Sequence, residues 1–148
     1  MNSLKTLFSI SILFLVIVML NSCASSSEPA KETAEQLFLK QLAGTWNTSV
    51  VTYDGVDVTK SFPSMRITLN ENKSIQVTNP VAPIWKATGT FVLEPSGSSF
   101  QLKRNDGLLI SVESSTSTKL VLTFLFDAST LTGRTNSVVG NFKFDLNK

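Results

Sequence analysis

The sequence contains no histidine and a single cysteine, Cys23, among its 148 residues. Without histidine the chain lacks the side chain that most often acts as a general base and as a transition-metal ligand. With one cysteine it cannot form an intramolecular disulfide, and both Ser–His and Cys–His nucleophile pairs are excluded. These absences argue against nucleophilic catalysis, and we expect no bound metal and no cofactor.

Charge is also scarce, because only 16% of the residues are Asp, Glu, Lys or Arg, and the formal net charge is +2. No long run of one sign occurs, whereas a nucleic-acid-binding surface needs clustered basic residues, so we expect no nucleic-acid partner. Paired carboxylates could still support acid–base chemistry. The candidates Glu94, Glu113, Asp127 and Asp145 fall at predicted strand ends or on solvent faces, where they are ordinary surface groups. We therefore do not expect an enzyme.

The N-terminus has the pattern of a targeting segment. Lys5 precedes an almost wholly apolar run over residues 7–20, which is followed by small residues. The run is shorter than the about 20 apolar residues that span a bilayer. Residues 1–22 are therefore predicted to be a signal peptide.

The segment Leu20-Asn21-Ser22-Cys23 resembles the lipobox of bacterial lipoproteins, in which a branched apolar residue and a small residue precede a cysteine. The resemblance implies that Cys23 carries acyl chains such as palmitate. Two or three such chains would hold the protein stably to a membrane, its expected partner. We expect an outer-membrane lipoprotein of the cell envelope, with the periplasmic or surface face left open. The alternative is a plain signal peptide followed by an incidental cysteine.

The rest of the chain is divided into a tether and one domain. Residues 23–32 are Ser-rich and predict a flexible tether, and residues 33–148 have the length of a single domain. The stretch Thr33–Leu42 favours a short helix, with Leu37 or Phe38 paired with Leu42 at helical spacing and Gly44 ending it.

From Thr45 onward, β-branched and aromatic residues alternate with polar ones between clusters of turn-forming residues. Eight strands are predicted, at about Trp46–Tyr53, Met65–Asn70, Ser74–Asn79, Ile84–Glu94, Phe100–Arg104, Leu108–Ser114, Lys119–Asp127 and Ser137–Leu146. No helical pattern separates them, so sequential antiparallel strands would form either a closed barrel or a sandwich.

The segment Gly44-Thr45-Trp46, at the start of the first strand and behind a short helix, resembles the lipocalins and their calycin relatives. The resemblance implies an all-β, eight-stranded antiparallel up-and-down barrel whose closed end is plugged by Gly44 and Trp46. In that family an arginine near the end of the last strand stacks on the tryptophan. Arg134 falls at the opposite mouth, so Lys143 or Lys148 would have to supply the cation–π contact.

In an up-and-down barrel the longest connections would lie at the open end, away from Trp46, where binding residues concentrate. The predicted ring of the mouth consists of Tyr53, Phe62, Trp85, Arg104 and Arg134. Behind it, the predicted interior lining consists of Phe91, Phe124 and Phe142.

More ordinary interpretations compete with this one. Eight strands leave room for at most one small ligand, and a packed core is favoured over a cavity. Arg104 and Arg134 are more typical of solvated loop residues. Asp54, Gly55 and Asp57 favour a turn over a calcium loop.

Two functional hypotheses follow. The first is a membrane-tethered barrel that binds a small apolar ligand at its open end, with Arg104 or Arg134 orienting a polar head group. The second is a structural module with a solid barrel that contacts an envelope protein or glycan. The sequence leaves the oligomeric state open, although we expect a monomer.

Overall fold

The structure, a computed structural model, describes residues 31–127 and 139–148. Helix α2 (Ala34–Leu42) comes first, and a short 3₁₀ helix, η1 (Thr59–Ser61), lies between β2 and β3. The strands are β1 (Gly44–Tyr53), β2 (Val56–Asp57), β3 (Arg66–Leu69), β4 (Ser74–Thr78), β5 (Thr88–Ser96), β6 (Ser99–Arg104), β7 (Leu109–Ser115), β8 (Lys119–Asp127) and β9 (Val139–Asn147).

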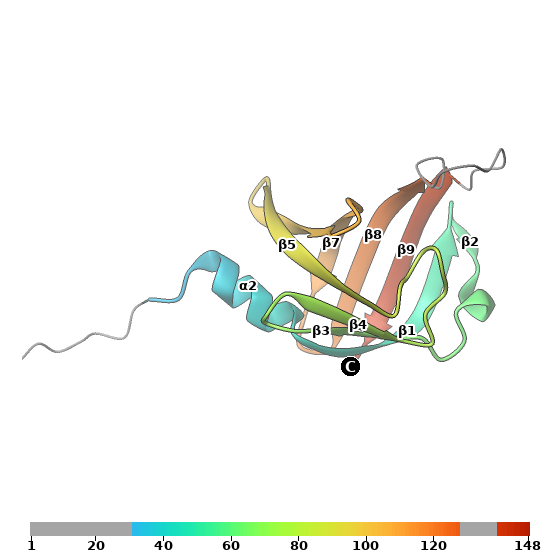
Figure 1. The fold of residues 1–148 in the computed structure, drawn as a ribbon, viewed down its shortest axis with the longest axis horizontal. Helices are drawn as coiled ribbons and strands as arrows, with labels where there is room; N and C mark the ends of the chain where they lie inside the picture. The colour runs from blue at the N-terminus through green and yellow to red at the C-terminus, as the bar shows by residue number, and fades with distance from the viewer. Residues whose placement is uncertain (1–30, 128–138) are drawn as a thin grey trace, which may run out of the picture. The chain divides into compact units, whose positions relative to one another are not determined.

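Eight of the strands form a closed antiparallel barrel (Figure 1). From β3 to β9 each strand pairs with the next, and β1 pairs with β3 through residues 44–47 and with β9 through residues 47–53. The pairing of the first strand with the last closes the sheet. The predicted eight antiparallel strands are therefore confirmed, and the sandwich alternative is excluded. Strand β2, which was not predicted, adds two residues alongside β1.

The alternation of apolar and polar residues seen in the sequence gives β8 and β9 one buried face. Leu120, Leu122, Phe124 and Phe126 are buried on β8, and Phe142, Phe144 and Leu146 are buried on β9. Their rings pack in offset stacks, with the centroid of Phe124 at 5.7 Å from those of both Phe142 and Phe144. Stacked aromatic side chains of β8 and β9 therefore form part of the hydrophobic core.

The two ends of the barrel carry different elements. Helix α2 packs against the end at which β1 begins, here called the closed end. There Glu35 pairs with Lys73 at 2.8 Å, and the ring of Phe38 lies 5.4 Å from that of Phe100. The opposite end, here called the open end, carries the connections 54–65, 79–87 and 105–108 and the adjoining ends of β8 and β9 (Figure 1). The predicted distribution of long connections is confirmed for these segments.

The start of the helix is capped, and its end differs from the prediction. Thr33 forms a capping box with Gln36, in which each side chain bonds the other residue's backbone N–H. The helix ends at Ala43 in extended conformation, and Gly44 is already the first residue of β1, with φ of +134°. Leu37 is 54% exposed, so Phe38 provides the apolar contact that was expected of either residue.

The predicted strand Ile84–Glu94 was wrong in its first part. Strand β5 begins only at Thr88, and residues 79–87 form a loop. Pro80 and Pro83 have no backbone N–H to donate to a sheet. The backbone N–H of Trp85 donates to the carbonyl of Val81 at 2.9 Å within the loop. Trp85 therefore belongs to a connection and not to the sheet.

The predicted strand ended at Glu94, whereas β5 continues to Ser96, with Pro95 opposite Phe100. Gly97 and Ser98 alone make the turn that follows. Within the described part of the chain, no helix has the length and apolar composition needed to cross a membrane.

Candidate binding site at the open end

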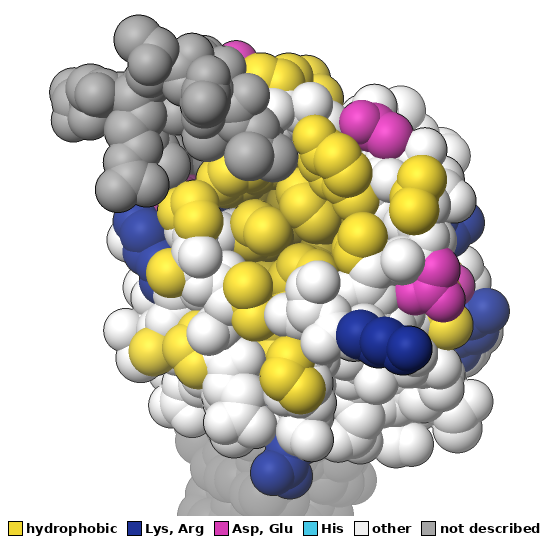
Figure 2. All heavy atoms as spheres, turned by 90° about the vertical axis from the view of Figure 1, so that its right-hand side faces the viewer, with side chains coloured by type: hydrophobic (Ala, Val, Ile, Leu, Met, Phe, Trp, Pro, Cys, Tyr) yellow, Lys and Arg dark blue, Asp and Glu magenta, His cyan; other side chains and the backbone are white. Residues whose placement is uncertain are grey.

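The open end carries an apolar hollow of about 210 Å³. Its lining consists of Tyr53, Val58, Ser61, Phe62, Val81, Ile84 and Phe142. Figure 2, which views this end, shows a continuous apolar area at the centre of the face. Tyr53, Phe62 and Phe142 were predicted to lie at or behind the mouth. Of the other four, Val58, Ser61 and Val81 come from connections without a strand or helix period, and Ile84 was assigned to a predicted strand, so sequence reasoning missed all four.

Tyr53 is held at the side of the hollow by β9. Its hydroxyl donates to the carbonyl of Val139 at 3.0 Å, and its ring centroid lies 4.9 Å from that of Phe142. A Cβ atom on Gly140 would lie only 2.2 Å from Cε2 of Tyr53. The absence of a side chain at Gly140 therefore creates the space that the tyrosine ring occupies.

The connection after β1 is shaped by two aspartates. Asp54 and Gly55 have φ of +46° and +82° and turn the chain directly into β2, so the predicted turn is confirmed. The carboxylate of Asp54 accepts from the N–H of Asn141 at 2.8 Å, and that of Asp57 accepts from the N–H of Thr59 at 2.8 Å. The hydrogen bonds from Thr59 lower the pKa of Asp57. Both carboxylates are thus used in local structure, and no cluster of metal-ligating side chains occurs in the described residues.

Aromatic rings pack behind the lining of the hollow. Phe62 is 3% exposed and meets Phe144 edge to face at 5.1 Å, and Trp85 meets Phe144 edge to face at 5.7 Å. Phe91 and Phe124 are buried in the core below, and neither lines the hollow. The site is therefore a shallow depression over a packed interior.

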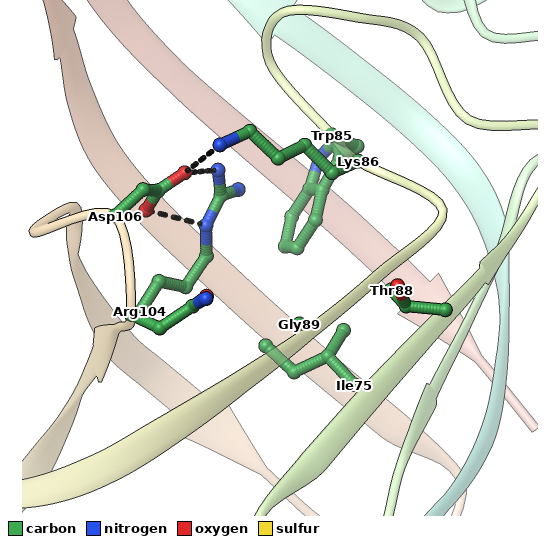
Figure 3. A pocket seen from close by; sticks show the side chains of 8 residues that line it. Ile75, Trp85, Lys86, Thr88, Gly89, Arg104 and Asp106 are labelled. Carbon is green, nitrogen blue, oxygen red and sulfur yellow. Dashed lines mark hydrogen bonds and ion pairs between the residues drawn. The ribbon is translucent and has the colours of Figure 1, made fainter.

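Arg104 lies beside the hollow and is only 6% exposed. The interpretation of Arg104 as a solvated loop residue was therefore wrong. It is the last residue of β6, and its guanidinium forms a bidentate contact with Asp106, with Nε to Oδ1 at 3.1 Å and Nη2 to Oδ2 (Figure 3). Nη1 donates to the carbonyl of Ile84 at 2.8 Å, and Cζ lies 5.2 Å from the ring centroid of Trp85. Arg104 already has an anion, an acceptor and an aromatic face, so it is not poised to orient a ligand head group.

Asp106 is the centre of this small charged group, since Nζ of Lys86 also lies 3.7 Å from its Oδ2. Burial would raise the pKa of Asp106, but the hydrogen bonds and charge of Arg104 outweigh it, and the pKa lies below its usual value. The space beside these residues is about 10 Å³, which is about the room of one water. The group is therefore a structural link, too tight for an organic ligand.

The closed end is built around Trp46, which is fully buried and donates its indole N–H to the carbonyl of Leu42 at 2.8 Å. Nζ of Lys148 lies 4.4 Å from its ring centroid and donates to the carbonyl of Ala43 at 3.0 Å. The side chain of Lys148 crosses Gly44, where a Cβ atom would lie 2.8 Å from its Cε. Of the two lysines considered from the sequence, Lys148 is the one at the tryptophan.

Several other sequence-based predictions concern surface residues or residues outside the description. Glu94 pairs with Lys103 at 2.9 Å, and Glu113 pairs with Lys143 at 3.0 Å. Arg134 and Cys23 lie outside the described residues, as do the predicted signal peptide and most of the tether. Comparison of the chain with protein-family models, with curated proteins and with solved structures found no match.

Proposed function

We propose that this chain is a lipoprotein exported by a signal peptide and anchored through Cys23 to the outer membrane, and that its lipocalin-like barrel binds a small apolar ligand at the open end. The observation that carries the binding proposal is the exposed apolar hollow lined by Tyr53, Phe62 and Phe142 together with four loop residues. Apolar surface exposed to water is unfavourable, and an apolar concavity commonly marks a ligand or partner site. The ligand would bind chiefly by removing this surface from water.

The size of the hollow limits the ligand. About 210 Å³ is less than the roughly 300–1,000 Å³ of pockets for drug-sized molecules. It exceeds the roughly 150 Å³ of an engineered cavity that accepts benzene. The hollow therefore suits one ring or a short acyl segment, and Ser61 is placed to supply a polar contact at its wall.

The membrane anchor and the family are proposed on other grounds. The anchor is supported by the lipobox-like segment before Cys23. The lipocalin-like assignment is supported by the short helix that leads into Gly44-Thr45-Trp46 and by the cation of Lys148 over Trp46. Non-enzymatic function is supported by the absence of histidine from the sequence.

A second candidate is a module that contacts an envelope protein or glycan through its outer surface. It is favoured by the filled interior and by the exposure of apolar side chains outside the barrel, including Leu109 at 44% and Leu125 at 55% on neighbouring strands. In this alternative the hollow would bind no ligand.

Titration with the neutral fluorescent probe N-phenyl-1-naphthylamine separates the two candidates. The non-lipidated Cys23→Ser chain should show a saturable rise in probe fluorescence and a higher Tm, because a ligand that binds only the folded state stabilises it by mass action. Val81→Asp, in the hollow, should abolish both effects. The matched change Val92→Asp, at a 51% exposed position on β5, should leave them intact.

A flat titration of folded parent protein, repeated with fatty acids and retinoids, would refute the ligand-binding proposal. The outer-surface module would then be the better explanation. Equal loss in Val81→Asp and Val92→Asp would show that the probe binds somewhere other than the hollow.

A further inference from the structure

Trp85 fills the core from a loop. The side chain is 1% exposed, and its ring lies edge to face against Phe124 at 5.8 Å and against Phe144 at 5.7 Å. Phe124 and Phe144 are buried, inward-facing residues of β8 and β9. A residue of the 79–87 connection therefore occupies space at the mouth of the barrel that the strands leave unfilled.

Within the described residues, the loop has few polar attachments to the rest of the barrel. Asn79 donates to the carbonyl of Ser64 at its start, and the carbonyl of Ala87 accepts from Val77 at its end. Between these points Arg104 donates to the carbonyl of Ile84. The centre of the loop is thus held by the hydrogen bond from Arg104, by the ion pair of Lys86 with Asp106 at 3.7 Å and by the burial of Trp85.

The indole N–H groups of the two tryptophans differ in their hydrogen bonding. The indole N–H of Trp46 has the carbonyl of Leu42 as acceptor, whereas that of Trp85 finds no acceptor among the residues that the structure describes. A buried donor without an acceptor loses its bonds to water and is destabilised. Trp85 is therefore held less firmly than its burial suggests.

Asp106 holds Arg104 in the position from which Arg104 contacts this loop. Arg104 contacts Asp106 and the face of Trp85 (Figure 3), and it also donates to the carbonyl of Ile84. Asp106 compensates the buried guanidinium charge, and a buried charge without a partner is strongly unfavourable. If Asp106 were lost, Arg104 would turn toward water and release both the loop carbonyl and the ring.

We propose that Trp85 is a removable plug and that the Arg104–Asp106 pair is the latch that keeps the 79–87 loop closed over the mouth of the barrel. Val81 and Ile84 of the same loop line the apolar hollow, so an outward movement of the loop would extend the hollow toward the barrel axis. The open form would accept an apolar chain longer than the closed hollow can hold. The ligand part of this inference rests on the proposed function, but the latch does not.

The latch can be tested without a ligand by acrylamide quenching of tryptophan fluorescence in the Cys23→Ser chain. Asp106→Asn should raise the quenching constant several-fold while the far-UV circular dichroism stays that of the folded parent. The rise should disappear when Trp85→Phe is added, which assigns it to Trp85. The matched control is Glu94→Gln, which breaks the outer-face pair with Lys103 on the same strand as Arg104 and should leave quenching unchanged.

Arg104→Met is the second variant, for the case in which Asp106→Asn folds poorly. It removes the buried cation, and the charge that it leaves behind, Asp106, is 24% exposed and still lies 3.7 Å from Lys86. It should raise quenching in the same way. Both variants should also bind N-phenyl-1-naphthylamine several-fold more tightly than the parent, because apparent affinity rises with the population of the competent state.

The outcomes separate the latch from the proposed function. Unchanged quenching in folded Asp106→Asn and Arg104→Met would overturn the latch, even if the parent binds the probe. Increased quenching in both variants without probe binding by any of them would support the latch and refute the ligand. Increased quenching with tighter binding would support both.

Discussion

Lys148 joins three neighbours at the closed end through one side chain. Its stem lies across Gly44, and its ammonium group contacts the ring of Trp46 and the carbonyl of Ala43. A cation over an indole face is worth about 0.5–1 kcal/mol at an exposed site. Because β9 ends here, this contact also ties the last strand to the first.

Replacing Lys148 tests this contact. Lys148→Met should lower the free energy of unfolding by about 0.5–1 kcal/mol, because it keeps the apolar stem and removes the cation. Lys148→Arg should retain most of the parental stability in urea melts, since a guanidinium can also stack on Trp46. Equal losses in both variants would mean that the stem, and not the charge, stabilises this end.

Gly140 is expected to tolerate no side chain while Tyr53 is present. Gly140→Ala should cost about 1–3 kcal/mol, the range for overpacking, because the new methyl group would displace the tyrosine ring. In a Tyr53→Leu background the same change should cost much less. A double-mutant cycle from urea melts measures this coupling, and additive losses would contradict it.

At the scale of elements, the accuracy of the sequence-based predictions followed the regularity of the pattern. Strand β8 has the predicted bounds, Lys119–Asp127, because its alternation is unbroken. The 79–87 loop was partly predicted as strand because Trp85, Ala87 and Gly89 continue the alternation of β5. The alternating pattern did not show that this segment, which contains Pro80 and Pro83, lies outside the sheet.

The candidate site was less predictable than the fold. Val58 and Val81 lie in connections without a period, so only the folded chain brings them together with Phe142. The burial of Arg104 was also missed, because charged residues are usually exposed. The only hint was Asp106 two residues later, a spacing that is equally common in solvated turns.

The free energy of unfolding should depend on pH through the Arg104–Asp106 pair, which links β6 to the 79–87 loop. The pKa of Asp106 is lower in the folded chain than its usual value, so its ionised form stabilises the fold above about pH 4. That contribution is lost as the pH falls through the folded pKa. In urea melts at pH 6, 4 and 2.5, the stability gap between the parent and Asp106→Asn should therefore narrow as the pH falls.

The Arg104→Met background provides the control for this experiment. There the carboxylate of Asp106 has lost its main partner, so Asp106→Asn should produce a smaller gap at pH 6 and less narrowing. Suppose instead that the difference in stability between the parent and Asp106→Asn stays constant from pH 6 to 2.5. That result would show that the Arg104–Asp106 ion pair does not stabilise the folded chain.

At the scale of the whole molecule, the proposed anchor decides where the barrel acts. Cys23→Ser should abolish acylation and move the protein from the membrane fraction to the soluble fraction, because the acyl chains supply the stable attachment. Fractionation with carbonate extraction measures this change. A variant that still pellets with membranes and resists extraction like the parent would refute the lipobox interpretation.

The pairing of β1 with β9 also has a kinetic consequence. The side-chain amide of Asn47 donates to the backbone carbonyl of Asn147, 100 positions away in the chain. Closing so long a loop costs chain entropy before any contact offsets it, and topologies dominated by distant pairings fold slowly. Because the ribosome releases the N-terminus first, β1 lacks its partner on that side until β9 has been made. The barrel cannot close before that point, which leaves time for the unfolded chain to cross a membrane as the proposed export requires.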